Sequence, residues 1–187
     1  MKALLILILP LLILSCRPAA APVSVSTRPI RPGEKVDTNL PMPPKRPVSE
    51  MVWTSMEGTT ANMGQLRGKA IILDFWATYC PPCRDEIPHL NELQAKYGID
   101  NLQIIGLNVG GDEDKPKIPA FAKEYKVSYP IAFPEDDLLQ FVTGNDDRIP
   151  QTAVFDRSGK LITKIVGFDN SAKKALDTAV ESALGTN

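Results

Sequence analysis

Hydrophobic residues run in short blocks along the chain, separated by stretches in which apolar and polar residues recur at helical spacing. The blocks 70–77 and 102–109 are apolar over nearly their whole length, which predicts central strands buried on both faces. Shorter strands are predicted at 129–133 and in two hairpins, at 51–60 and 150–168. Helical spacing predicts helices at 82–97, 115–127, 135–142 and 171–184.

The order of these elements indicates the fold class. Strand, helix, strand and helix, followed by a hairpin and a last helix, predict an α/β domain with a central mixed sheet. Helices should cover both faces of that sheet, and a short hairpin should precede it. We expect this domain to occupy residues 48–187.

Composition and charge agree with a folded domain and exclude one class of partner. Of the 187 residues, 43% are hydrophobic and 23% are charged, so the chain can bury a core. The net charge is −1, and the sequence shows no concentration of lysine and arginine of the kind that nucleic-acid binders carry. We therefore expect no nucleic-acid partner.

The first 15 residues differ from the rest of the chain. Their apolar run, Ala3 to Leu14, is shorter than the roughly 20 residues that a membrane-spanning helix needs, so 1–15 is interpreted as a signal peptide. The run ends in Ser15-Cys16, which resembles the lipobox of bacterial lipoproteins, where the cysteine carries lipid. Cleavage of an ordinary secretory signal at Ala19–Ala21 is the alternative.

Residues 16–47 predict a linker. They contain eight prolines and few large apolar residues, a composition typical of extended, semi-rigid segments. We expect a lipid-anchored tether that holds the domain on the periplasmic face of a bacterial membrane. Arg17 rather than Asp follows Cys16, and the resemblance to the usual sorting signal then implies the outer membrane. Either signal exports the domain to a compartment that permits disulfides.

The remaining two cysteines stand close together, after the strand at 70–77 and at the start of the helix at 82–97. Helix N-termini expose unpaired N–H groups and a partial positive charge, which stabilise a thiolate. Pro81 and Pro82, between the cysteines, suit the first helical positions. We expect Cys80 at the exposed end of the helix and Cys83 one turn inward, within disulfide reach of each other.

Other interpretations of the pair have less support in the residues. A zinc site needs further Cys or His ligands, and His89 is the only histidine; we expect it at the surface and predict no metal site. A structural disulfide across two residues would close a very small loop, which stabilises little. Thiolates also suit Cu(I), so a copper-binding chaperone stays an alternative to a redox-active pair.

A family resemblance covers roughly 48–184. The segment ILDFWATYCPPCRDEIPHL, with IIGLNV, FAKEYKVSYPIAF and RIPQTAVFDRSGKLI after it, resembles the thioredoxin fold and, within it, the extracytoplasmic TlpA/ResA-like thiol–disulfide oxidoreductases. The resemblance implies that Cys80 is the nucleophile, that Cys83 resolves the mixed disulfide, and that Pro150 is a cis-proline facing them. A cis bond there would offer the backbone of Ile149 to an extended substrate segment.

The resemblance also assigns two acids and a docking surface. Asp74 matches the buried carboxylate of thioredoxin, which many TlpA/ResA-like proteins lack, and Glu86 matches an acid of the ResA-like branch. Burial should raise the pKa of Asp74, so that either acid could take the Cys83 proton. A local strand-end hydrogen bond for Asp74 and a solvated helix face for Glu86 are the alternatives. Tyr79 stands where many relatives have Trp and, with Pro81 and Pro82, borders the pair.

The predicted activity is therefore thiol–disulfide exchange without a cofactor. We expect reduction of protein disulfides, with electrons from a membrane thiol carrier; apocytochrome c, in cytochrome c maturation, is the family-typical client. A disulfide-forming oxidase and a peroxiredoxin-like antioxidant enzyme are the enzymatic alternatives. The acid-rich segments 110–119 and 132–148 fit the central insertion of the TlpA/ResA-like branch, and we expect their acids to be solvated.

Overall fold

The computed structural model describes residues 46–185. The predicted signal peptide at 1–15, with Cys16, Arg17 and all but the last two residues of the predicted linker, lies outside the described residues. Among the residues that are described, no helix combines the length and the apolar character needed to cross a membrane.

A seven-stranded sheet organises the described part of the chain, in the order β2-β1-β5-β4-β3-β6-β7. The central strands β5, β4 and β3 are parallel, and the strands outside them pair antiparallel. The predicted mixed sheet is confirmed. The strands are β1 (Val52–Ser55), β2 (Thr60–Asn62), β3 (Ala70–Trp76), β4 (Leu102–Asn108), β5 (Ile131–Pro134), β6 (Gln151–Phe155) and β7 (Leu161–Val166).

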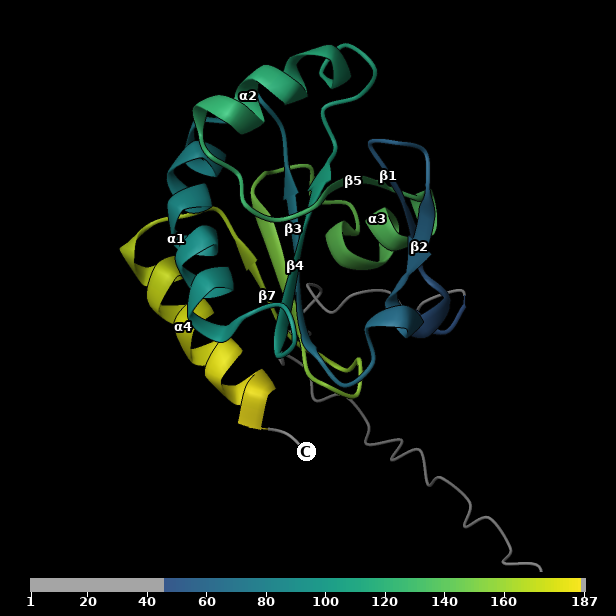
Figure 1. The fold of residues 1–187 in the computed structure, drawn as a ribbon, viewed down its shortest axis with the longest axis vertical. Helices are drawn as coiled ribbons and strands as arrows, with labels where there is room; N and C mark the ends of the chain where they lie inside the picture. Colours follow the sequence, from purple (N-terminus) through teal and green to yellow (C-terminus); the bar gives the residue numbers. More distant parts are fainter. Residues whose placement is uncertain (1–45, 186–187) are drawn as a thin grey trace, which may run out of the picture. The chain divides into compact units, whose positions relative to one another are not determined.

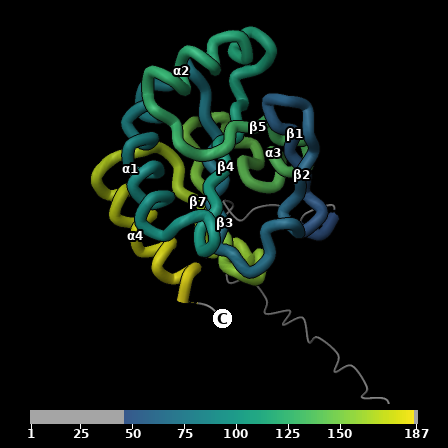
Figure 2. Tube along the Cα trace, viewed as in Figure 1, coloured from purple at the N-terminus to yellow at the C-terminus, as the bar shows by residue number. Residues whose placement is uncertain are grey.

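Helices cover both faces of this sheet. Figures 1 and 2 show α1 and α4 side by side on one face and α3 on the other. The helices are α1 (Pro81–Tyr97), α2 (Ile118–Glu124), α3 (Asp136–Thr143) and α4 (Asn170–Gly185), and short 3₁₀ turns are η1 (Val48–Glu50), η2 (Met63–Leu66) and η3 (Lys115–Lys117). The arrangement gives the sheet two apolar cores, one on each face.

Strand β3 is buried at every position because it contributes to both cores. Successive side chains of a strand point to opposite faces. Leu73 and Phe75 accordingly join the core under α3, and Ile72 joins the core under α1 and α4. The same alternation places Asp74 on the α1 face, between apolar neighbours.

A third apolar cluster closes the end of the sheet where β3 leads into α1. Trp76, at the end of β3, stacks on Phe121 of α2 with ring centroids 4.9 Å apart. Ile118 of the same helix and both cysteines belong to this cluster. Helix α2 therefore packs against the cysteine pair at the N-terminus of α1.

Two sequence expectations differ from the structure. The helix predicted at 115–127 is a 3₁₀ turn followed by α2, which ends at Glu124. Lys126 takes a positive φ of 54°, which ends the helix and turns the chain toward β5. His89 is buried rather than at the surface: its ring lies between α1 and α4, with Nε2 2.9 Å from Asp177 Oδ1.

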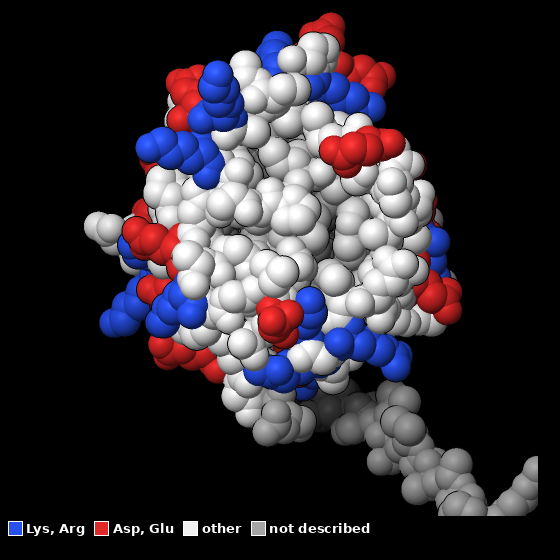
Figure 3. Space-filling model, viewed as in Figure 1, with Lys and Arg blue, Asp and Glu red and all other residues white. Residues whose placement is uncertain are grey.

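The charges are dispersed over the face seen in Figure 3. Lysine, arginine, aspartate and glutamate side chains lie mainly around the margin of this face, and its middle shows few of them. No large area of one sign stands out in this view, in keeping with the net charge of −1.

Candidate functional site

The cysteine pair forms a disulfide at the N-terminus of α1, with an S–S distance of 2.06 Å. Cys80 is the N-cap residue, and its sulfur accepts a hydrogen bond from the Cys83 N–H at 3.3 Å. Pro81 and Pro82 fill the first two helical positions, where the missing N–H costs no intrahelical bond. After reduction, the Cys83 N–H would stabilise a Cys80 thiolate through the same hydrogen bond.

The sulfurs lie deeper than the sequence suggests. Cys80 is 4% exposed and Cys83 2%, so the prediction of an exposed Cys80 is wrong for the disulfide-bonded form. Packing against Trp76 and Ile118 covers both residues. Tyr79, by contrast, is 60% exposed beside the pair. Tyr79 is therefore an exposed side chain next to a buried disulfide.

The predicted proline loop is at the same end of the sheet. The Ile149–Pro150 peptide bond is cis, as the resemblance implies. Ile149 packs against the apolar cluster that contains both cysteines, and the Pro150 C=O accepts a hydrogen bond from the Gly167 N–H at 2.8 Å. Within residues 46–185, no hydrogen bond is found on the Ile149 N–H or C=O, so both stay available to an incoming strand.

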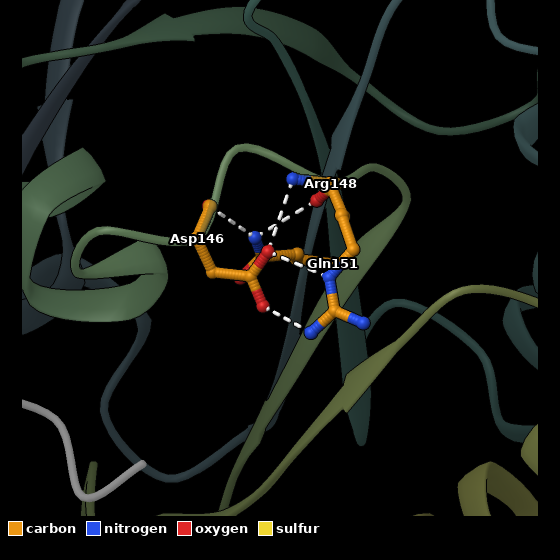
Figure 4. Close-up of polar contacts among 3 residues, drawn as sticks. All are labelled: Asp146, Arg148 and Gln151. Carbon is orange, nitrogen blue, oxygen red and sulfur yellow. Dashed lines mark hydrogen bonds and ion pairs between the residues drawn. The ribbon is translucent and has the colours of Figure 1, made fainter. Parts of the chain in front are cut away.

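Hydrogen bonds among three residues that the sequence analysis did not single out connect the segments before and after this proline (Figure 4). The Asp146 carboxylate accepts hydrogen bonds from the Arg148 N–H at 3.1 Å and from its guanidinium at 2.6 and 2.8 Å. These bonds lower the pKa of Asp146 to about 2. The Gln151 side chain donates to the C=O groups of Asp146 and Arg148. The chain is thus held on both sides of Ile149 and Pro150.

The two predicted acids interact with each other on the α1 face of the sheet, and Glu86 lies one helical turn after Cys83. Asp74 is 2% exposed and Glu86, from α1, is 1% exposed. Thr152, which faces Asp74 across the β3–β6 pairing, donates its hydroxyl proton to Glu86 Oε1 at 2.6 Å. The Tyr129 hydroxyl is hydrogen-bonded to the Asp74 side chain. Asp74 Oδ1 and Glu86 Oε2 have no hydrogen-bond partner among the described residues.

Burial raises the pKa values of both carboxyls. It raises the pKa of Asp74 well above its usual value, and the neighbouring Glu86 carboxylate raises it further. Burial also raises the pKa of Glu86, to about 7, although the Thr152 hydrogen bond works against this. The alternative of a solvated helix face for Glu86 is wrong. Together, the two acids can release or accept a proton near neutral pH.

Tyr129 and Thr152 are polar members of this site that the sequence analysis missed. Thr152 had a usable signal, because it lies two residues after Pro150, the residue that the resemblance places opposite the cysteine pair. Tyr129 had none: its ring lies over β4, so close that a Cβ added at Gly106 would be 3.0 Å from Tyr129 Cε2. Gly106, the β4 partner of Asp74, leaves the space that this ring fills.

Comparisons with known proteins agree with this geometry. The Redoxin family model matches residues 43–180. The chain is 34% identical over 116 residues to the thiol-disulfide oxidoreductase ResA of Bacillus cereus, covering 62% of this chain and 65% of that protein. It is 30% identical over 133 residues to ResA of Geobacillus kaustophilus, covering 71% and 74%. The first of these matches thus spans a little less than two thirds of the relative.

A solved structure shows the same fold. The thiol:disulfide interchange protein of the thioredoxin family from Chlorobium tepidum is 30% identical to this chain, with a TM-score of 0.61. The match covers 75% of this chain and 98% of that one, so it includes nearly all of the solved chain. The thioredoxin fold predicted from the sequence is therefore confirmed. With its cysteine pair at the N-terminus of α1, the chain belongs to the redoxin family and is a relative of the ResA thiol-disulfide oxidoreductases.

Proposed function

We propose that this protein is an extracytoplasmic thiol–disulfide oxidoreductase that reduces disulfides of client proteins. One observation carries the proposal: a Cys80–Cys83 disulfide stands at the N-terminus of α1, and the buried acid Glu86, one turn further along this helix, interacts with buried Asp74. The names of its ResA relatives support the same reaction class. Because the reacting atoms are the two sulfurs, the reaction requires no cofactor.

The reaction has two exchange steps. In the reduced protein, the Cys80 thiolate attacks a client disulfide and forms a mixed disulfide, and the first client sulfur leaves as a thiolate that takes up a proton. Cys83 then loses its proton and attacks the Cys80 sulfur. That step forms the Cys80–Cys83 disulfide and releases the second client sulfur. One client disulfide becomes two thiols, and the enzyme dithiol becomes a disulfide.

The acids give the second step its base. Cys83 is 2% exposed, so water has little access to its proton. Asp74 and Glu86 are also buried, and at least one of them can be ionised near neutral pH, since the pKa of Glu86 is about 7. In our proposal one of these carboxylates accepts the Cys83 proton and passes it to the departing client thiolate. General-base assistance of this kind typically accelerates a step by about 10²–10⁴-fold.

The docking surface follows from the exposed groups around the pair. The free N–H and C=O of Ile149, next to the cis Pro150, would pair with an extended client segment on one side of the disulfide. Tyr79 and Pro81, both exposed, border the other side, and the partly buried Pro82 adjoins them. Apocytochrome c, in cytochrome c maturation, is the client that we favour.

The direction of the reaction depends on the reduction potential, which also separates reductase from oxidase. A reductase should have a potential closer to the about −270 mV of thioredoxin than to the about −120 mV of DsbA. Equilibration of the protein with glutathione, followed by thiol trapping, measures it. Reduced protein should also cleave the insulin disulfides in a turbidity assay, and Cys80→Ser should not. A potential near that of DsbA would mean that the protein installs disulfides.

The proposed location rests on residues 1–47. In our proposal the signal peptide exports the chain, Cys16 carries lipid, and the proline-rich linker lets the domain reach a membrane thiol-reductant protein. Arg17 favours the outer membrane. Cys16→Ala should release the domain from the membrane fraction while insulin reduction in vitro stays intact. A Cys16→Ala protein that sediments with membranes would contradict the lipid anchor and leave the enzymatic proposal untouched.

A further inference from the structure

A buried carboxylate from another segment of the chain binds the turn that connects β3 to α1. Thr78 lies two residues before Cys80 and is 7% exposed. Its N–H donates to Asp114 Oδ2 at 2.9 Å, and its hydroxyl donates to Asp114 Oδ1. Asp114 is 1% exposed and belongs to the segment between β4 and α2, 36 residues further along the chain. One carboxylate thus takes both hydrogen-bond donors of a single residue of the turn.

Asp114 is itself fixed by its surroundings. The side chain of Asn108, the last residue of β4, donates to Asp114 Oδ2 at 2.8 Å. The Lys117 N–H donates to the Asp114 C=O at 2.9 Å. Gly110 passes so near that an added Cβ would clash with Asp114 Oδ2. These contacts connect the carboxylate to the end of β4 and the Asp114 backbone to η3.

Helix α1 holds the same turn from the other side. The Arg84 guanidinium donates to the Thr78 C=O at 2.8 Å and lies over the ring of Tyr125, 5.9 Å from its centroid. Within the turn, the Cys80 N–H donates to the Ala77 C=O at 3.2 Å. All three polar groups of Thr78 are consequently bound, two by Asp114 and one by Arg84. The backbone that carries Cys80 is fixed on both sides.

We propose that Asp114 is a positioning residue for Cys80. By binding Thr78, it keeps the turn in the form that presents the Cys80 sulfur to the N-terminus of α1. The segment 110–117 thereby sets the reactivity of the nucleophile without touching it. This inference rests on the proposed function, because it concerns how reactive the cysteine pair is.

The neighbouring acids supply matched controls. The sequence analysis expected all acids of 110–119 to be solvated. That expectation is correct for Asp112 and Glu113, which are exposed, and wrong for Asp114. Although burial raises the pKa of Asp114, the hydrogen bonds from Asn108 and Thr78 outweigh it and lower the pKa below its usual value. Asp112→Asn removes the same charge from the same segment without touching Thr78.

The experiment compares wild type, Asp114→Asn and Asp112→Asn. Cys80 alkylation by iodoacetamide is followed against pH by mass mapping, and the disulfide is equilibrated with glutathione. In Asp114→Asn, an amide NH₂ would face the Thr78 or Asn108 donors, so the turn should loosen and Cys80 should leave the helix end. We expect a higher Cys80 pKa and an equilibrium about tenfold more in favour of the disulfide, which is about 30 mV. Asp112→Asn should match wild type.

Other outcomes overturn the assignment. A lower Cys80 pKa in Asp114→Asn would mean that Asp114 acts as a fixed negative charge. Unchanged alkylation and equilibrium in a folded variant would mean that it serves the fold alone. Thr78→Val, which removes only the hydroxyl, should shift both readouts in the same direction by less, and Thr78→Ser should restore them; this pair decides the question if Asp114→Asn does not fold. Failure of the proposed function would appear separately, as inactive wild type.

Discussion

Three buried carboxyls lie near the active-site turn, and folding shifts their pKa values in opposite directions. Asp74 and Glu86 have raised pKa values. Asp114, beside Thr78, has as little exposed area but lies nearer the surface of the protein, and its pKa is lowered. Two differences account for this: Asp114 lies at a shallower depth, and it accepts more hydrogen bonds. Asp114 accepts three, from Thr78 and Asn108, whereas each acid of the pair has one side-chain donor and one oxygen without a partner.

The comparison shows that a small exposed area alone does not decide what a carboxyl can do. A carboxylate with several donors stays ionised and acts as a structural anchor. Asp156 follows the same rule: it accepts from the Ser158 N–H, the Ser158 hydroxyl and the Lys160 N–H, and its pKa is lowered. A buried pair short of donors keeps a proton near neutral pH, and that proton is available for chemistry.

The largest expected effect is on stability, at Glu86. Its pKa is raised by folding, so the folded state holds the proton more tightly and stability falls as pH rises from about 4.5, the unfolded value, through about 7. Glu86→Gln cannot ionise and escapes this loss. The variant should match wild type near pH 4 and exceed it at pH 8 by on the order of 3 kcal/mol.

Denaturant melts of the oxidised protein across this pH range measure the effect. Asp85→Asn, at the adjacent exposed position of α1, is the control and should leave the pH dependence unchanged. Wild-type and Glu86→Gln stabilities that run parallel from pH 4 to pH 8 would contradict the raised pKa.

The next largest effect, also on stability, is expected at Gly110, which lies against Asp114. The Cβ of an alanine there would clash with Asp114 Oδ2, so the carboxylate or the segment must shift. Overpacking of this kind costs about 2 kcal/mol. Gly185→Ala, which has no atom within 4 Å of the added carbon, is the control. Equal denaturant midpoints for Gly110→Ala and wild type would show that the Asp114 segment is loosely held.

Asp74→Asn should affect turnover. The first attack, by Cys80, should stay largely intact because it relies on the helix N-terminus. The resolving step should slow, and turnover near pH 7 should fall about tenfold or more, with less effect at high pH where Cys83 ionises unaided. Insulin reduction measured against pH tests this. Unchanged turnover at every pH would show that Asp74 is not the base and would leave Glu86 as the candidate.

The smallest effect is expected at Tyr129. Its hydrogen bond lowers the pKa of Asp74 against the larger effect of burial, so Tyr129→Phe should raise that pKa further. Fewer Asp74 side chains would be ionised at pH 7, and turnover should drop by about threefold, the scale of one hydrogen bond. Tyr97→Phe, a tyrosine substitution at the far end of α1, is the control. A Tyr129→Phe pH–rate profile that overlies wild type would remove Tyr129 from the site.

The sequence predicted the burial of Asp74 but not that of Asp114. The apolar run around Asp74 and the helix that carries Glu86 are local patterns, and local patterns predict burial well. The Asp114 anchor depends on a contact across 36 residues that no periodicity encodes. Within the run Asp112-Glu113-Asp114 the residue types do not reveal which acid turns inward. The burial of His89 against α4 escaped prediction for the same reason.

Trapping of the mixed disulfide tests the central claim most directly. In Cys83→Ser the resolving thiol is gone, so attack by Cys80 on a disulfide-containing client peptide should stop at the covalent intermediate. Mass spectrometry under non-reducing conditions should show one client attached per protein, through Cys80, and release by dithiothreitol. Cys80→Ser should form much less adduct. Absence of an adduct in Cys83→Ser, or an equal amount in Cys80→Ser, would contradict the account.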